Sequence, residues 1–266
     1  MSIIMHYNYD SYELASNSIQ DDFNKHFSEV VKCLEKWDSI VNSAAHNLQN
    51  DGDAFLLALH AHSLFLGAIR LAKSGHSSAV YPLLRTAFES ATYALLFTQD
   101  EDLSEKWKNR HQSEDSFKQS KTAFTPAMKK LRLILQEYDK HSQCTPYKEY
   151  IMSTYDAVID FGAHPNPITI TNNSLVSSDG DVIKYEYLNQ LDDQMIKGIF
   201  ACIDLGVVLS IVMYLSEVLR VADADSLDKK FTSFINENNA LADKINGSPI
   251  GFDERYYNRV NAHTKI

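Results

Sequence analysis

The sequence predicts an all-α protein: a helical bundle of about seven or eight helices with one short β-hairpin inserted near residues 168–187. Two observations support this fold class. Apolar residues recur at steps of three and four over most of the 266-residue chain, which is the period of an amphipathic helix. The chain also has only 9 Gly and 6 Pro, fewer than the many turns of an all-β or Rossmann fold require.

Turn and capping residues divide the chain into elements. The Asn-Asp-Gly-Asp run at 50–53 ends the first long helix and caps the second, and Gly75 is placed to end the second. Residues 246–266 show no helical period, so we expect an irregular tail. No linker rich in Pro, Gly or Ser separates the segments, which predicts a single domain over residues 1–266. The predicted helices are 17–50, 54–73, 77–97, 103–120, 126–141, 147–162, 191–222 and 227–245.

The helical period is interrupted after His164. The segments PITITNN (167–173) and DVIKYEY (181–187) alternate β-branched and aromatic residues with others, and they flank the turn-like SSDGD (177–181). Two strands alone are only marginally stable in water. We therefore expect this hairpin to pack on the bundle or to pair with another subunit.

The composition limits the classes of partner. Hydrophobic residues make up 44% and charged residues 23% of the chain, ordinary values for a globular protein that argue against disorder. The net charge of −10 argues against a broad nucleic-acid footprint, so DNA is not an expected partner. Cys33, Cys144 and Cys202 are odd in number and widely spaced, which favours reduced structural thiols in a cytoplasmic protein over disulfides or a zinc site.

Two segments bear on membrane association. The N-terminal residues MSIIMHYNYDSYELAS lack the basic, apolar and cleavage regions of a signal peptide. The segment GIFACIDLGVVLSIVMYLSEVL (198–219) is nearly long enough to span a bilayer. It contains Asp204 and Glu217, and an acidic group near the bilayer centre costs about 2.5–3.5 kcal/mol. We therefore expect a central helix of a soluble bundle and no membrane partner.

One predicted helix, SSAVYPLLRTAFESATYALLF (77–97), carries a single cation and a single anion, Arg85 and Glu89, four residues apart. This spacing places them on one helix face together with Tyr81 and Tyr93. Solvated faces usually carry several Lys and Glu residues, whereas this one offers small and aromatic polar groups. Because buried charges must be paired, the pattern predicts either a buried structural ion pair or a shared polar site.

A second candidate is DFGAHPNP (160–167), at the end of a predicted helix. Asp160 and His164 are spaced to meet across one helical turn, and Pro165 favours an extended exit. A carboxylate that orients an imidazole suits a general base or a metal ligand. An ordinary helix C-terminus has the same pattern, because a protonated His complements the helix dipole. His164, Arg85, Glu89 and Asp160 are therefore our candidate catalytic residues.

Several kinds of chemistry lack support in the sequence. His60 and His62 are two residues apart and would point to different faces of a helix, and neither HExxH nor paired Glu-x-x-His motifs occur. A G-x-S-x-G motif and Gly-rich phosphate loops are also absent, so we expect no metal and no cofactor. Trp107 and Arg110, in EKWKNRH, are interpreted as a helix anchor and its solvated neighbour, with nucleotide stacking as the alternative.

The pattern LLRTAFES (83–90), followed by a WxxR helix and then a helix that ends in His164, resembles a group of uncharacterised bacterial helical-bundle proteins. These are themselves distantly similar to the HEPN superfamily. The likeness covers roughly Ala54–Pro167. It implies an all-α bundle, frequent dimers and, in active members, metal-independent RNA cleavage in defence or toxin–antitoxin systems. Active members share an Arg a few residues before a His; that Arg is missing here, so only His164 carries over and Arg85 would supply the cation.

These observations leave the choice between a binding protein and an enzyme open. The leading hypothesis is a self-associating bundle, a homodimer, that binds a small anionic or nucleotide-like ligand near Arg85. The alternative is a HEPN-like ribonuclease acting on RNA, with His164 as acid or base and Arg85 stabilising phosphate charge. A metal-dependent bundle enzyme is a third class. A shared pocket for Arg85, Glu89, Asp160 and His164 would favour the enzyme hypotheses.

Overall fold

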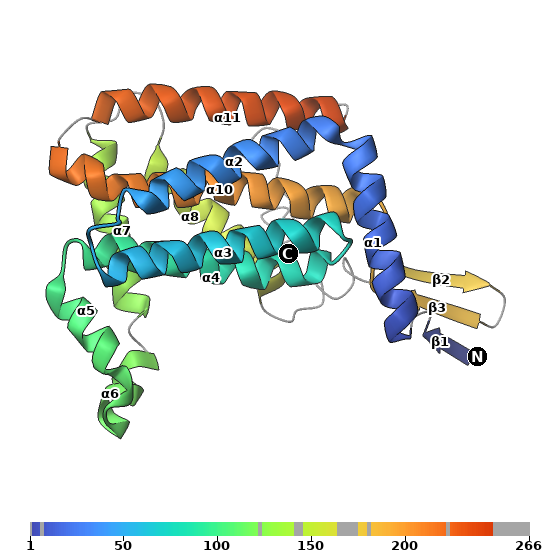
Figure 1. Ribbon diagram of the computed structural model, residues 1–266, viewed down its shortest axis with the longest axis horizontal. Helices are drawn as coiled ribbons and strands as arrows, with labels where there is room; N and C mark the ends of the chain where they lie inside the picture. Colours follow the sequence, from blue (N-terminus) through green and yellow to red (C-terminus); the bar gives the residue numbers. More distant parts are fainter. Residues whose placement is uncertain are drawn as a thin grey trace, which may run out of the picture.

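The computed structural model describes residues 2–5, 8–121, 124–140, 146–163, 175–179, 182–221 and 224–246. Helices make up most of this part of the chain and form a bundle (Figure 1), so the predicted bundle class is confirmed. Whether the whole chain forms a single domain stays a prediction. The expected tail at 246–266 lies almost wholly outside the described residues.

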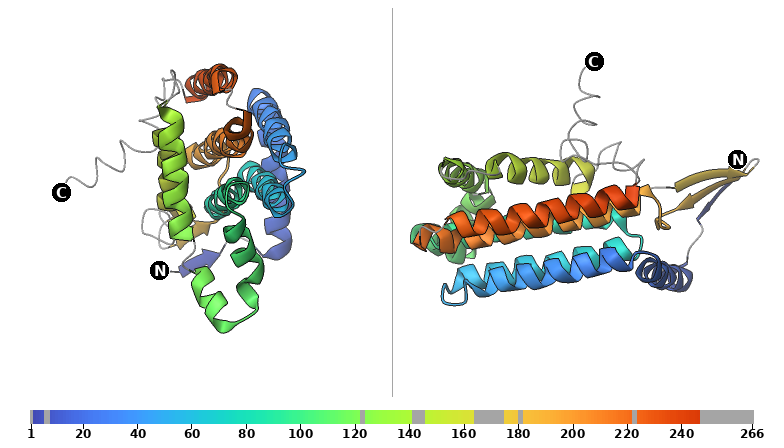
Figure 2. Two further views of the ribbon diagram at one scale, coloured as in Figure 1. Left: turned by 90° about the vertical axis from the view of Figure 1, so that its left-hand side faces the viewer. Right: turned by 90° about the horizontal axis from the view of Figure 1, so that it is seen from above.

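The centre of the bundle is α10 (Asp193–Val221). In the end-on view of Figure 2 it lies between the other long helices, and it contacts each of them. Its residues from Ile199 to Leu215 are buried along nearly the whole length, apart from Tyr214. The surrounding helices are α2 (Ser28–His46), α3 (Asp53–Lys73), α4 (Ser77–Phe97), α8 (Tyr147–Val158) and α11 (Ala224–Asn246).

Two helices, α3 and α10, are long and apolar enough to cross a membrane. In α10, 94% of the apolar window is buried inside the protein, so its place in the core accounts for its composition. In α3 only 33% of the corresponding window is buried. The apolar residues of α3 therefore extend onto the surface, and localisation stays a prediction.

The turn between α3 and α4 forms as the sequence predicts. Gly75 has φ +86°, and its N–H and that of His76 bond to the carbonyls of Ala72 and Leu71 at 3.3 and 2.9 Å. This is a Schellman cap, in which a residue with positive φ ends the helix. α4 then begins at Ser77 and ends at Phe97, the bounds expected from the sequence.

The long helix predicted at 17–50 is wrong, because this stretch contains two helices. α1 (Tyr9–His26) begins at a capping box in which Asn8 and Ser11 bond each other's backbone, and it ends at Phe27 before α2. Phe27 has φ −118° and ψ 45°, outside the helical range, although neither Gly nor Pro marks the break. The apolar period continues across Phe27, so the sequence pattern alone does not reveal the change of direction.

A similar break divides the helix predicted at 103–120. The chain forms α5 (Glu101–Lys108), a 3₁₀ turn (Asn109–His111) and α6 (Glu114–Lys121). α7 (Phe124–Asp139) follows, and α8 continues into a turn at Ile159–Ala163 that is kinked at Gly162, where the backbone leaves the helical range.

The β part of the predicted fold class is wrong. The predicted isolated two-stranded hairpin is not found: the two strands that form within 168–187 belong to a mixed sheet of order β1–β3–β2 beside α1 (Figure 1). β2 (Leu175–Asp179) is antiparallel to β3 (Val182–Glu186), and β1 (Ser2–Met5) is parallel to β3. The expected first strand at 167–173 lies outside the described residues, and β2 instead takes in part of the predicted turn. A four-residue strand that pairs with a segment so distant in the sequence leaves no periodic signal.

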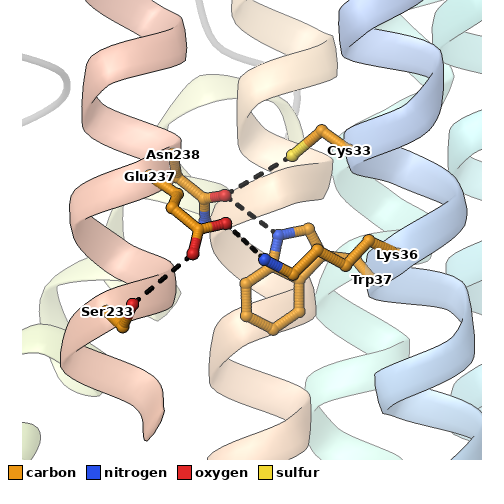
Figure 3. A network of polar contacts seen from close by, with 6 residues as sticks. All are labelled: Cys33, Lys36, Trp37, Ser233, Glu237 and Asn238. Carbon is orange, nitrogen blue, oxygen red and sulfur yellow. Dashed lines mark hydrogen bonds and ion pairs between the residues drawn. The ribbon is translucent and has the colours of Figure 1, made fainter. Parts of the chain in front are cut away.

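A polar network fastens α11 to α2 (Figure 3). The indole Nε1–H of Trp37, which is fully buried, donates to Oδ1 of Asn238 at 3.1 Å, and the Cys33 thiol donates to the same oxygen at 3.4 Å. At the surface Lys36 forms an ion pair with Glu237, which also accepts from Ser233 Oγ at 3.4 Å. The pairing of these groups sets the position of α11 along α2.

The Asn238→Ala variant should lower the free energy of unfolding by about 1–3 kcal/mol, because the buried indole N–H of Trp37 loses its acceptor. Urea unfolding measures this change. Asn236→Ala is the matched control, since Asn236 lies on the same helix and is exposed. Equal losses in the two variants would mean that the Trp37–Asn238 bond does not hold α11.

Two of the three cysteines should be chemically inert in the folded protein. Burial raises the pKa of the Cys33 thiol to about 11, and it also raises the pKa of Cys202, which is fully buried in α10. Only the thiolate is nucleophilic, and at pH 8 on the order of one Cys33 thiol in a thousand would be ionised. Iodoacetamide followed by mass spectrometry should label neither residue in native protein and both in guanidinium. Rapid labelling of native Cys33 at pH 8 would contradict this expectation.

Candidate functional site

The ion pair expected from the spacing in α4 is present. Nε of Arg85 lies 2.8 Å from Oε1 of Glu89, and the two side chains are 29% and 26% exposed. The pair is therefore neither a fully buried structural bridge nor a pair on a solvated face. Its groups remain partly accessible from solvent.

Tyr155 of α8 joins this pair. Its hydroxyl donates to the same Glu89 oxygen at 3.1 Å, and its ring stacks on Phe88 with centroids 4.5 Å apart. Burial and then the Glu89 charge raise the pKa of Tyr155, so the phenol keeps its proton and remains a donor. Burial alone would lower the pKa of Arg85, but its hydrogen bond to Glu89 and the carboxylate charge outweigh that effect and raise it. Arg85 and Tyr155 thus converge on one carboxylate oxygen.

A second guanidinium group, that of Arg110, acts electrostatically on Tyr93, as Glu89 does. Arg110, in the 3₁₀ turn after α5, is half-buried, and its Nε is buried without a hydrogen-bond partner among the described residues. Burial and the charge of Glu89 raise the pKa of Tyr93, whereas the charge of Arg110 lowers it. Both charged groups therefore act on the Tyr93 hydroxyl. We call Arg85, Glu89, Tyr93, Arg110 and Tyr155 the two-arginine site.

Aromatic rings surround the two-arginine site. Tyr93 packs against Phe97 and Phe124 with centroids 5.9 and 5.7 Å apart, and Phe97 contacts Trp107 at 5.8 Å. Trp107 is half-buried, so its interpretation as a helix anchor is confirmed. Arg110 lies one helical turn further along the chain and is not the solvated neighbour that the sequence suggested. The i, i+3 spacing of Trp107 and Arg110 was the signal that could have placed both at this site.

The second group of candidate residues consists of Asp160 and His164. The described contacts do not join this group to the two-arginine site. Asp160 is exposed, and partial burial of its carboxyl group and the charge of Asp156 raise its pKa. His164 lies outside the described residues. The segment before it does reach α4: a Cβ at Gly162 would lie 2.6 Å from Cδ2 of Tyr81, so only glycine fits this close approach.

The described residues do not bring the remaining acidic and histidine candidates together. Asp204 is 2% exposed in α10, and its charge raises the pKa of Cys33 on α2, away from the described contacts of Glu89. His60 bonds Ser90 on α4 at 3.0 Å, and His62 bonds Asp38 on α2 at 2.6 Å, so the two rings have different partners. In the described part of the chain no group of three His, Cys, Asp or Glu side chains could hold a metal ion.

Comparisons of the chain with protein-family models, with curated proteins and with solved structures find no match. The resemblance to the HEPN-related bundle proteins therefore stays a prediction. The function has to be inferred from the chemistry of the two-arginine site.

Proposed function

We propose that this protein binds a small anionic ligand at the two-arginine site. The observation that carries the proposal is the buried Nε of Arg110, which has no hydrogen-bond partner in the described part of the chain. A buried donor without an acceptor costs about 1–3 kcal/mol, and a ligand oxygen would remove that cost. Planar guanidinium groups bind carboxylate and phosphate oxygens with two parallel hydrogen bonds.

The charge of the site also supports an anion. It contains two guanidinium groups and one carboxylate, so it has a positive surplus in a chain with a net charge of −10. Partial burial strengthens the attraction, because charges interact more strongly away from bulk water. Tyr93 stays protonated, since its pKa is raised, and can donate a hydrogen bond to a ligand, whereas the single hydroxyl proton of Tyr155 is already donated to Glu89.

The aromatic surroundings narrow the ligand class. Tyr93, Trp107 and Phe124 are half-buried, so these three aromatic residues are partly accessible to solvent. Planar ligand groups stack favourably on such rings. A nucleotide-like molecule, with an anionic group for the arginines and a flat base for the rings, fits both features.

Calorimetric titration of the protein with inorganic phosphate, adenosine and AMP tests the proposal. We expect AMP to bind more tightly than either of the other two, since it alone combines the anion with the planar group. The affinity should fall as salt is added, because the attraction is partly electrostatic. Adenosine binding as tightly as AMP would contradict an anion site, and a lack of binding by phosphate and AMP alike would overturn the proposal.

The alternative function, a metal-independent ribonuclease, has one observation in its favour. Gly162 packs against Tyr81 on the same helix as Arg85, and His164 follows two residues later in the sequence. The alternative requires RNA cleavage in the presence of EDTA, with loss of cleavage in His164→Ala. Intact RNA, or undiminished cleavage by that variant, would exclude it.

A further inference from the structure

The segment that carries Trp107 and Arg110 lies outside the bundle of long helices. It consists of α5 and the 3₁₀ turn at Asn109–His111, and in Figure 1 it projects from one end of the bundle together with α6. Ser104 is the one residue of α5 that is buried. An element with so few buried residues depends on a small number of side-chain contacts for its position.

Two ion pairs join this segment to the bundle. Asp100, just before α5, pairs with Lys130 of α7 at 2.8 Å. Asp53 of α3 pairs with Nζ of Lys108 at 2.9 Å. Because Lys108 is the last residue of α5, the second pair lies only two residues from Arg110 in the sequence.

Asp53 holds α5 at two points with one carboxylate oxygen. Its Oδ2 accepts from Nζ of Lys108 at 2.9 Å and from Oγ of Ser104 at 3.1 Å, and the two donors lie one helical turn apart. The Asp53 side chain is 24% exposed and Ser104 only 9%, so water screens this contact less than an ordinary surface ion pair. The hydrogen bond from Lys108 holds the pKa of Asp53 below its ordinary value, so the acceptor is ionised at neutral pH.

Arg110 depends on this contact more than the other charged groups of the two-arginine site do. Arg85 and Glu89 both lie on α4, so the helix itself fixes their spacing. Arg110 lies on the projecting segment, and its Nε has no hydrogen-bond partner in the described part of the chain. The position of its guanidinium group therefore depends on how α5 is held.

We propose that Asp53 is a positioning residue for the two-arginine site: by holding α5 against the first turn of α3, it keeps Arg110 where a ligand oxygen can reach its Nε. The inference rests on the proposed function, anion binding at this site. An acidic residue in the first turn also complements the helix dipole of α3. That role alone would affect stability and leave the ligand affinity unchanged, so the two roles predict different results.

Calorimetric titration with AMP separates the two roles. Asp53→Ala should raise the AMP dissociation constant about fivefold or more, because Arg110 is no longer held at the site. Loss of a carboxylate makes the protein less negative, so long-range electrostatics alone would change the affinity for an anion in the opposite direction. Glu105→Ala is the matched control, since Glu105 also bonds Lys108 at 2.9 Å but belongs to α5 itself. It should leave the AMP affinity unchanged or slightly higher.

A double variant shows whether Asp53 acts through Arg110. In the Arg110→Met background, Asp53→Ala should change the AMP dissociation constant by less than about twofold, because the group that Asp53 positions is already absent. An equal effect of Asp53→Ala in the wild-type and Arg110→Met backgrounds would overturn the proposal.

Fluorescence quenching by acrylamide reports the position of α5 without a ligand. The chain has two Trp residues; Trp37 is fully buried and Trp107 on α5 is half-buried, so quenching reports mainly on Trp107. Asp53→Ala should raise the quenching constant, whereas Glu105→Ala should not. Circular dichroism establishes that both variants are folded.

The outcomes separate this inference from the proposed function. If Asp53→Ala binds AMP as tightly as wild-type protein while Arg110→Met binds it more weakly, the positioning role is wrong and the anion site stands. Unchanged quenching in Asp53→Ala would also exclude the positioning role, whatever the affinity. Wild-type protein that binds neither AMP nor phosphate overturns the proposed function and this inference with it.

Discussion

The Glu89→Ala variant is expected to lose about 2–4 kcal/mol of unfolding free energy, because a half-buried guanidinium and a half-buried phenol lose their common acceptor. Oε1 of Glu89 accepts from Arg85 at 2.8 Å and from Tyr155 at 3.1 Å, so one substitution removes both bonds. The half-buried Arg85 guanidinium then loses the carboxylate charge that lies 2.8 Å from its Nε. Urea unfolding monitored by circular dichroism measures the loss.

The chain contains a matched control for this prediction. Glu114 and Lys118 form an ion pair with the same four-residue spacing, but the two side chains are 81% and 65% exposed. Solvent-exposed pairs contribute little to stability, so Glu114→Ala should change the unfolding free energy only slightly. Similar losses in the two variants would show that burial and the Tyr155 bond add nothing to the Arg85–Glu89 pair.

The second large effect is expected from Gly75→Ala. Gly75 has φ +86°, and a Cβ there would lie 2.6 Å from the backbone oxygen of Asn189, which leads into α10. Asn189 also donates its N–H to the carbonyl of Gly75 at 2.9 Å, so the two backbones cannot separate without losing this bond. The strained φ and the collision together should cost about 3 kcal/mol or more.

Gly52→Ala separates the cost of the positive φ from the cost of the collision with a neighbouring backbone. Gly52 also has a positive φ, of +53°, but an added Cβ would have no heavy atom within 4 Å. This variant should therefore lose only the backbone term, about 1–3 kcal/mol. A loss in Gly75→Ala no larger than that in Gly52→Ala would mean that the turn and the Asn189 segment are not in close contact.

The elements predicted well from sequence are those whose ends carry a local chemical signal. Gly75 marks the boundary between α3 and α4, and both helices have almost the expected bounds. The break at Phe27 has no such mark, and the pairing of Ser2–Met5 with Val182–Glu186 depends on residues far apart in the sequence. Both features arise from tertiary packing, which periodicity does not encode.

The candidate site also combines contacts that a local sequence pattern predicts with contacts that arise only from tertiary packing. Arg85 and Glu89 could be paired from sequence because one helix fixes their spacing. Tyr155 contacts Glu89 only through the packing of α8 on α4, and Arg110 acts on Tyr93 from the turn after α5, so the spacing within α4 predicts neither neighbour. The function of the site depends on these tertiary neighbours, which is why the sequence alone left binding protein and enzyme open.

The most direct test of the central claim is calorimetric titration of AMP into wild-type protein, Arg110→Met and Lys118→Met. Methionine keeps most of the aliphatic stem and removes the charge in both variants. The account predicts that Arg110→Met raises the AMP dissociation constant about tenfold or more, the value of one charge-assisted hydrogen bond, and that Lys118→Met leaves it unchanged. Equal AMP affinity in wild-type protein and Arg110→Met would contradict the account.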